Sequence, residues 1–368
     1  MIYILYSADY ELFLGKNNYP ENEILITPTY ELLDVCKKNG IKLTLFCDTC
    51  CLWRYTQLGK IDFPTHIEEQ LKYAITEGND VQCHLHPHWL FTDFTNGFYQ
   101  VDLDKFLLGN LSEDIIKCEE KIFELLKNSS KYLQNLLTPV NPKYKCIAFR
   151  AGGYGIQPKT RTIVKALKRA GYSIDSSVVP GLRLKSNVNQ IDFCDYPEEP
   201  NYFLIDHPDL FELNNKENGI FEIPIPSLKS NKLLNILYIL RYLQFKLFTK
   251  DQNNIIKGYP IQQIDNNKNH ENMRFYEKYF KIITFILKDQ TYVLDVGNDP
   301  YLLRNITNKH IKKYKNADNI FFSVNIHPKD MTRNKFEALQ KYHSLMKKEY
   351  KNIQSITFQE AFDIIQSQ

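Results

Sequence analysis

Three histidines lie within five residues of one another in the segment QCHLHPHW, residues 82–89. They are His84, His86 and His88, out of nine histidines in the whole chain. Imidazole is a common zinc ligand, and zinc sites in proteins use three or four ligands in all. The cluster therefore predicts a site for Zn²⁺ or another divalent transition metal, with Asp9, Glu11 or water completing the ligand set.

The spacing of these histidines leaves two geometries open. On an extended segment all three side chains would share one side, because alternate residues of a strand point the same way. His84 and His88 are four apart and would also share one side of a helical turn. Pro87 disfavours the interior of a helix but is tolerated in its first turn.

Other polar residues fall at the ends of predicted strands. Asp9 and Glu11 follow the first strand, Arg150 ends a later one, Asp175 lies in a short one and His327 ends the last. In a parallel α/β barrel the carboxyl ends of the strands form one face, and that face carries the active site. We therefore expect these residues to converge in space.

The elements that must position these residues alternate along the chain. Short apolar runs predict strands at 2–7, 41–47, 80–85, 144–150, 172–177, 220–225, 292–297 and 320–327. Helical periodicity predicts helices at 28–38, 64–77, 112–136, 159–170 and 332–350. Strands that alternate with helices indicate βαβ units and a mostly parallel sheet, and eight candidate strands allow a barrel.

Two regions interrupt this alternation. Residues 185–219 are polar and rich in Pro and Asn, which indicates a long loop. Residues 228–290 hold two helix-rich segments joined by a polar loop, which indicates a helical insertion in a single domain rather than a second domain. The first of these segments, 233–248, is apolar nearly all round. It could be a buried or dimer-forming helix, or it could lie on a membrane surface with Arg241 and Lys246 at the headgroups.

Composition excludes several classes of protein. The 46 basic and 43 acidic residues give a net charge of +3, which does not indicate a surface that binds nucleic acid. The N-terminal residues read as a strand rather than a signal peptide, and no run of 18 apolar residues predicts a transmembrane helix. We therefore expect a cytoplasmic protein; its oligomeric state is not indicated.

The eight cysteines fit a reducing compartment, where thiols stay free. Cys47 and Cys50 form a C-x-x-C pair followed directly by Cys51. A structural zinc site usually needs a second such pair, and a redox pair needs a thioredoxin-like context; the sequence offers neither. We interpret these cysteines as buried or semi-buried thiols.

The chain resembles the polysaccharide deacetylase family, carbohydrate esterase family 4, which has the nodulation-factor deacetylase homology fold. The likeness covers roughly residues 1–225 and 290–365 and rests on the order and spacing of five short motifs. These are SADYE (7–11), HLHPH (84–88), RAGGYG (150–155), DSS (175–177) and VNIHP (324–328). The first motif resembles a variant branch with Asp-x-Glu in place of two adjacent Asp. The resemblance implies a single (β/α) barrel over 1–368, irregular or seven-stranded, with 228–290 as an insertion.

The family's reaction is the metal-dependent removal of an N-acetyl group from a sugar. By resemblance, Asp9 would be the base, Arg150 would hold its carboxylate, and His327 would protonate the leaving amine. A backbone N–H near Tyr154 would meet the oxyanion, although Gly152 and Gly153 stand where the family has proline.

The resemblance also implies a ligand set of Glu11, His84 and His88, with the roles of Asp9 and Glu11 exchangeable. The roles of three further residues are left open. His86 could be a ligand, a substrate contact or a supporting residue, Asp175 could serve the site or cap a strand, and Trp89 could line a sugar site or fill the core.

The substrate would be a small molecule or an oligosaccharide, and a cytoplasmic enzyme would favour a nucleotide- or lipid-linked sugar. Two alternatives remain. One is another metal-dependent amide or imide hydrolase on the same fold, and the other is a carbohydrate-binding relative without catalysis.

Overall fold

The computed structural model describes residues 1–13, 20–95, 98–197, 199–207, 210–213, 218–248, 286–287 and 289–367, with the backbone alone over 242–248. The second helix-rich segment predicted within the insertion lies outside these residues.

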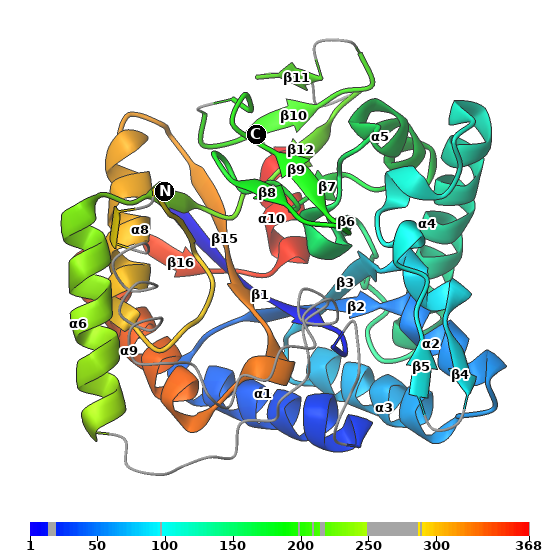
Figure 1. Cartoon of the computed structure of the whole chain (residues 1–368), viewed down its shortest axis with the longest axis horizontal. Helices are drawn as coiled ribbons and strands as arrows, with labels where there is room; N and C mark the ends of the chain where they lie inside the picture. The colour runs from blue at the N-terminus through cyan, green and yellow to red at the C-terminus, as the bar shows by residue number, and fades with distance from the viewer. Residues whose placement is uncertain are drawn as a thin grey trace.

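A curled sheet of parallel strands forms the centre of the protein (Figure 1). Within the described residues seven parallel strands follow one another in the order β12-β7-β6-β3-β2-β1-β15, and one further strand near the end of the chain pairs parallel with β1 off this path. Their bounds are β1 (Ile2–Tyr10), β2 (Leu43–Asp48), β3 (Asp80–Leu85), β6 (Ala148–Ala151), β7 (Ile174–Asp175), β12 (Ile220–Glu222) and β15 (Ile320–Ile326). The prediction of an α/β barrel, irregular or seven-stranded, is confirmed as an α/β fold with a curled, mostly parallel sheet.

The seam between β12 and β15 is closed by single hydrogen bonds instead of a ladder. The Ser323 amide donates to the Pro224 carbonyl at 2.9 Å. The Asn201 side chain accepts from the Phe321 amide and donates to the carbonyls of Phe321 and Glu222. One asparagine thus stands in for the backbone partners that the two strands lack here.

Helices surround this sheet (Figure 1). They are α1 (Thr27–Asn39), α2 (Thr49–Gln57), α3 (Asp62–Thr76), α4 (Ile115–Leu137), α5 (Thr160–Arg169), α8 (Pro300–Lys313) and α9 (Arg333–Glu349). Five of them match the predicted helices. The sequence analysis missed α2 and α8, although each starts at an aspartate cap, Asp48 or Asp299, whose side chain accepts from backbone amides of the first turn. Short single turns (η1, Asn22–Ile26; η3, Leu103–Lys105; η4, Leu108–Asn110) and a small hairpin of β4 (Asp93–Thr95) and β5 (Phe98–Gln100) complete this side.

The amino end of the barrel is sealed by the last elements of the chain. Strand β16 (Ile353–Ser355) pairs with Ile2–Ile4 of β1, and helix α10 (Phe358–Ser367) follows it. One apolar cluster joins the barrel interior to α10: Tyr3, Leu5, Phe46, Ile147, Ala148, Ile174, Ile223, Phe321, Ile356, Phe358, Ala361 and Ile365. The interior of the barrel is therefore filled with side chains at this end.

Phe358 is the largest side chain that α10 contributes to this cluster. It is fully buried, and its ring meets that of Phe46 edge-on at 4.9 Å. We expect Phe358→Ala to lower the free energy of unfolding by about 3–5 kcal/mol, because it removes a buried aromatic ring and leaves a cavity. Urea unfolding measures this loss, with the exposed Phe94→Ala as the control. Equally small losses of unfolding free energy in both variants would contradict the packing of α10 against the barrel interior.

The region 185–219 is not the long loop that its composition indicated. Strand β8 (Arg183–Lys185) pairs with β9 (Gln190–Asp192), and β10 (Tyr202–Leu204) with β11 (Phe211–Glu212) extends the sheet beyond β12. Each of these strands has only two or three residues, so the alternation of apolar and polar residues that would reveal a strand is absent.

The two ends of the segment predicted to be an insertion lie side by side. Strand β13 (Ser227–Lys229) and strand β14 (Thr291–Val293) pair antiparallel, and helix α6 (Lys232–Phe248) begins between them. Only residues 292 and 293 of the strand predicted over 292–297 belong to this small sheet, and Asp295 forms an isolated parallel bridge with Asn325. None of the helices over the described residues is both long and apolar enough to cross a membrane.

Candidate active site

The predicted strand-end residues converge at the carboxyl end of the barrel. Asp9 ends β1, His84 ends β3 and Arg150 ends β6, and these strands lie within four positions of one another in the sheet. His327 follows β15, the other neighbour of β1. The Asp9 carboxylate contacts the side chains of Arg150 and His327, and the His84 ring contacts the Arg150 carbonyl and Glu11.

Arg150 holds the Asp9 carboxylate from inside the barrel. Its Nη1 donates to Asp9 Oδ1 at 2.7 Å and to Asn325 Oδ1 at 2.9 Å, and its side chain is fully buried. The remaining guanidinium N–H groups donate to the hydroxyls of Ser7, Ser176 and Ser323 and to the Ser176 carbonyl. Burial alone would raise the pKa of Asp9, but the Arg150 charge together with His327 and His84 holds that pKa well below its usual range. Asp9 is therefore ionised.

His327 bridges two carboxylates at the open side of the site. Its Nε2 lies 3.4 Å from Asp9 Oδ2 and its Nδ1 lies 3.3 Å from Asp295 Oδ2. Burial would lower the pKa of His327, but Asp295 and Asp9 outweigh it and hold the pKa well above its usual value. The side chain is 21% exposed. His327 can therefore carry a proton at the edge of the site.

Glu11 gathers three cationic or potentially cationic partners. Lys329 Nζ lies 2.6 Å from one carboxylate oxygen, while His84 Nε2, at 3.3 Å, and His86 Nε2 face the other. His84 Nδ1 bonds the Arg150 carbonyl at 2.9 Å, which fixes its proton there and leaves Nε2 free to act as a ligand. Burial would raise the pKa of Glu11, but Lys329 and His86 hold it well below its usual range.

Two groups of side chains could hold a metal ion in the described part of the chain. Glu11, His84 and His86 offer donor atoms that all lie within 4.8 Å of one another, and so do Asp9, Glu11 and His327. The His86 ring is buried, and its Nδ1 makes no hydrogen bond to any described residue. A buried carboxylate beside two imidazoles with free nitrogens is the donor set that zinc and similar cations take.

His88 does not join Glu11. The chain leaves β3 after Leu85, and Pro87 opens a 3₁₀ turn, η2 (Pro87–Phe91), that carries His88 away. Its fully buried ring packs against Trp89 and Phe106, at 5.4 and 5.5 Å between ring centres. Burial lowers the pKa of His88 well below its usual range, so the ring is neutral. The structure thus brings His86, two residues from His84, to the place where the resemblance put the residue four away.

The turn after β6 shows why two glycines precede Tyr154. A Cβ on Gly152 would lie 2.5 Å from the His86 ring, and Gly153 has a φ of 60° beside the Phe106 ring. This turn, η5 (Gly152–Tyr154), therefore packs directly on the histidine segment. Asn189, from the region 185–219, donates to the Gly153 carbonyl at 2.6 Å and covers the turn.

Asp175 and Trp89 lie apart from the donor groups. Asp175 is fully buried and accepts from the Ser177 amide and hydroxyl at 3.0 and 2.8 Å, beside Glu222. It therefore caps the end of its strand. Trp89 is fully buried and packs edge-on against Tyr55 and Tyr99, so it fills the core and does not line an open site.

Four residues of the site escaped the sequence analysis: Asp48, Asp295, Asn325 and Lys329. Asp48 Oδ1 accepts from the His86 amide at 3.2 Å, while its buried Oδ2 has no hydrogen-bond partner among the described residues. Burial raises the pKa of Asp48 to about 6. Its position at the end of a predicted strand was the signal that could have found it.

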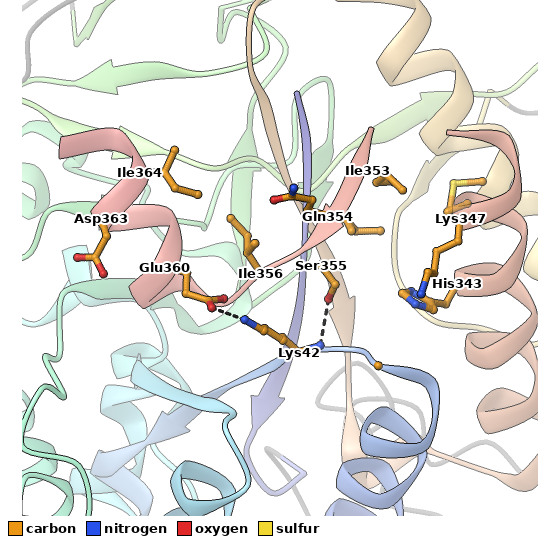
Figure 2. A pocket seen from close by; sticks show the side chains of 13 residues that line it. Lys42, His343, Lys347, Ile353, Gln354, Ser355, Ile356, Glu360, Asp363 and Ile364 are labelled. Atoms are coloured by element: carbon orange, nitrogen blue, oxygen red, sulfur yellow. Dashed lines mark hydrogen bonds and ion pairs between the residues drawn. The ribbon is translucent and has the colours of Figure 1, made fainter. Parts of the chain in front are cut away.

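A hollow of about 540 Å³ lies at the opposite end of the barrel, between β16, α9 and α10 (Figure 2). Lys42 pairs there with Glu360, and its amide donates to the Ser355 hydroxyl. None of the convergent residues lines this hollow. The predicted thiols Cys47, Cys50 and Cys51 are buried and free, as expected.

No protein-family model matches the chain, and no curated protein is significantly similar to it. Among solved structures, a candidate polysaccharide deacetylase from Mycobacterium smegmatis is 9% identical, with 100% of this chain and 90% of that chain covered and a TM-score of 0.47. A candidate polysaccharide deacetylase from Pseudomonas aeruginosa PAO1 is 11% identical, with 98% and 89% covered and a TM-score of 0.44. The allantoinase Puue is 9% identical, with 97% and 87% covered and a TM-score of 0.42.

Proposed function

We propose that the protein is a metal-dependent hydrolase that removes an N-acetyl group from a sugar. The observation that carries this proposal is the position of Asp9. Its carboxylate is held ionised by Arg150, touches His327, and stands beside the donor group of Glu11, His84 and His86. Side chains that could serve as general base, general acid and metal ligands therefore lie side by side.

Glu11, His84 and His86 would hold the metal, a zinc or another divalent transition ion. Such an ion, when bound, polarises a carbonyl and lowers the pKa of a bound water from about 15.7 toward 7. The Asp48 side chain accepts a hydrogen bond from the His86 amide and so helps to hold the histidine segment in position.

The residues around that site supply the proton transfers. Asp9 accepts the proton of the attacking water, and Arg150 keeps its carboxylate oriented. His327 then gives its proton to the leaving nitrogen, and Asp295 orients the imidazole through Nδ1. A backbone N–H of the Gly152–Tyr154 turn would donate to the oxyanion, as the family resemblance implies.

Acetate release from a panel of N-acetylated sugars, measured with and without added Zn²⁺, tests the proposal. We expect release that a chelator abolishes and zinc restores. No release from any sugar of the panel, from a protein that holds the metal, would overturn it.

A membrane contact through α6 is a separate proposal. One side of this helix exposes Leu233, Ile236, Leu237 and Leu240, an i, i+3, i+4, i+7 pattern. We expect the protein to float with vesicles rich in phosphatidylserine, and Leu237→Glu with Leu240→Glu to abolish flotation, since a charged group opposes insertion of the apolar face.

The control for that experiment is Ile116→Glu, which changes an exposed apolar residue on α4. If the wild type does not float with the vesicles, or if it forms a dimer and the double variant is a monomer, a contact between subunits is favoured instead.

A further inference from the structure

A second cavity opens beside His327. It has a volume of about 590 Å³ and lies between α6, β14 and the start of α8. Asp295 lines it and also contacts His327 Nδ1 at 3.3 Å. Asp295 is therefore shared by the cavity wall and the candidate site, on the side of the His327 ring that carries Nδ1.

The walls of this cavity are aromatic. Tyr238 of α6, Tyr292 of β14 and Tyr301 of α8 line it, and the first two rings are 5.4 Å apart. The Tyr301 side chain is 45% exposed. Tyrosine rings offer flat apolar faces with a polar edge, which suits the C–H faces and hydroxyl groups of a pyranose.

The charges in the cavity balance. Arg241 and Lys335 are opposed by Asp295 and Asp299, and Arg241 pairs with Asp299 at 3.1 Å. Asp299 is further committed, because its other oxygen accepts from the amides of Tyr301 and Leu302 at the start of α8. A cavity with no net charge and many donors and acceptors favours a neutral, hydroxyl-rich ligand over a phosphate.

We propose that this cavity is a sugar subsite, which binds a neutral pyranose unit of an N-acetylated oligosaccharide while the acetamido group lies at Asp9 and His327. The position of the acetamido group in this inference rests on the proposed deacetylation. The leaving nitrogen stays with the sugar, so the sugar extends from the side of His327, where the cavity lies. The insertion, through α6, then determines which saccharide is accepted.

Gly297 gives a direct way to close the cavity. It lines the space, its φ is not positive, and a Cβ built on it meets no atom within 4 Å. Gly297→Leu therefore fills the cavity without forcing the backbone. Tyr301→Ala removes one wall, and Tyr73→Ala, which alters a tyrosine of similar exposure on α3, is the matched control.

Two readouts separate the subsite from the chemistry. Hydrolysis of 4-nitrophenyl acetate reports the catalytic groups without any sugar, and acetate release from N-acetylated gluco- and galacto-trisaccharides reports both. We expect Gly297→Leu and Tyr301→Ala to raise KM for the trisaccharide about tenfold or more and to leave ester hydrolysis and the Tyr73→Ala control unchanged. Unchanged KM in both variants would overturn the subsite and leave the deacetylase intact.

A binding measurement tests the subsite even if the wild type releases no acetate. Titration calorimetry of the Asp9→Asn variant with the same trisaccharides needs no turnover. Binding that Gly297→Leu abolishes would support the subsite even if the wild type released no acetate, and only the proposed reaction would then fail. No binding of either trisaccharide to Asp9→Asn would overturn the subsite.

Discussion

Asp9→Asn is expected to lower kcat for acetate release by roughly 10²–10⁴-fold, the range usual for loss of a general base. Asparagine has the same shape and can still accept from Arg150, so the site keeps its packing, but the amide cannot take a proton from water. His327→Ala should give a loss of similar size, because it removes the proton donor. The measurement is steady-state kinetics beside metal content, which should stay at the wild-type level in both variants.

The control is Asp34→Asn, which changes a carboxylate in an exposed helical pair with Lys38. It should leave kcat unchanged. Near-normal rates in both Asp9→Asn and His327→Ala would contradict the assignment of base and acid.

The pH profile adds an independent check on His327. Only its protonated form can donate, and its pKa lies above the usual value of about 6.5 because Asp295 and Asp9 stabilise the charge. Activity should therefore persist through neutral pH and fall as pH rises through this raised pKa. The residual activity of His327→Ala should lack that alkaline fall; its retention would assign the fall to another group.

Replacing both His84 and His86 by alanine is expected to abolish metal binding. The two imidazoles supply two of the three donors beside Glu11, and a single carboxylate does not retain a transition metal. Elemental mass spectrometry of the purified protein should find about one metal ion per chain in the wild type and none in the variant.

His88→Ala is the informative companion to that variant. Its ring packs between Trp89 and Phe106 and does not reach Glu11, so the metal should stay although stability falls. Metal lost in His88→Ala but kept in a single His86→Ala variant would show that the pair four residues apart is the ligand pair. Circular dichroism of each variant verifies that the fold survives.

The convergence of Asp9, Arg150 and His327 could be predicted from the sequence because of a simple rule. Parallel strands bring their carboxyl ends to one face, so polar residues that end separate strands must meet there. The seven strands were found because most of these buried runs are rich in apolar residues, and helical patterns separate many of them along the chain.

The choice between His86 and His88 could not be made in that way. It depends on the residue at which β3 ends and on the direction that Pro87 gives the turn, and element ends are the least certain part of any sequence-based assignment. Asp295 and Lys329 lie in connecting segments with no periodicity, and the barrel seam depends on Asn201 in a region that looked like a loop. Contacts of this kind are set by the tertiary fold and leave no local pattern.

The pairing of β1 sets the order in which this barrel can assemble. Its residues Ile2 to Ala8 pair with Ile320 to Ile326 of β15, and Ile2 to Ile4 also pair with β16. As the chain emerges from the ribosome, one edge of this apolar strand has no partner until more than three hundred further residues have been made. Contacts between residues so far apart in the sequence form slowly, and until they form the unpaired edge of β1 is prone to aggregation. The nascent protein should therefore depend on chaperones, and yields of soluble protein should rise when synthesis is slowed by lower temperature.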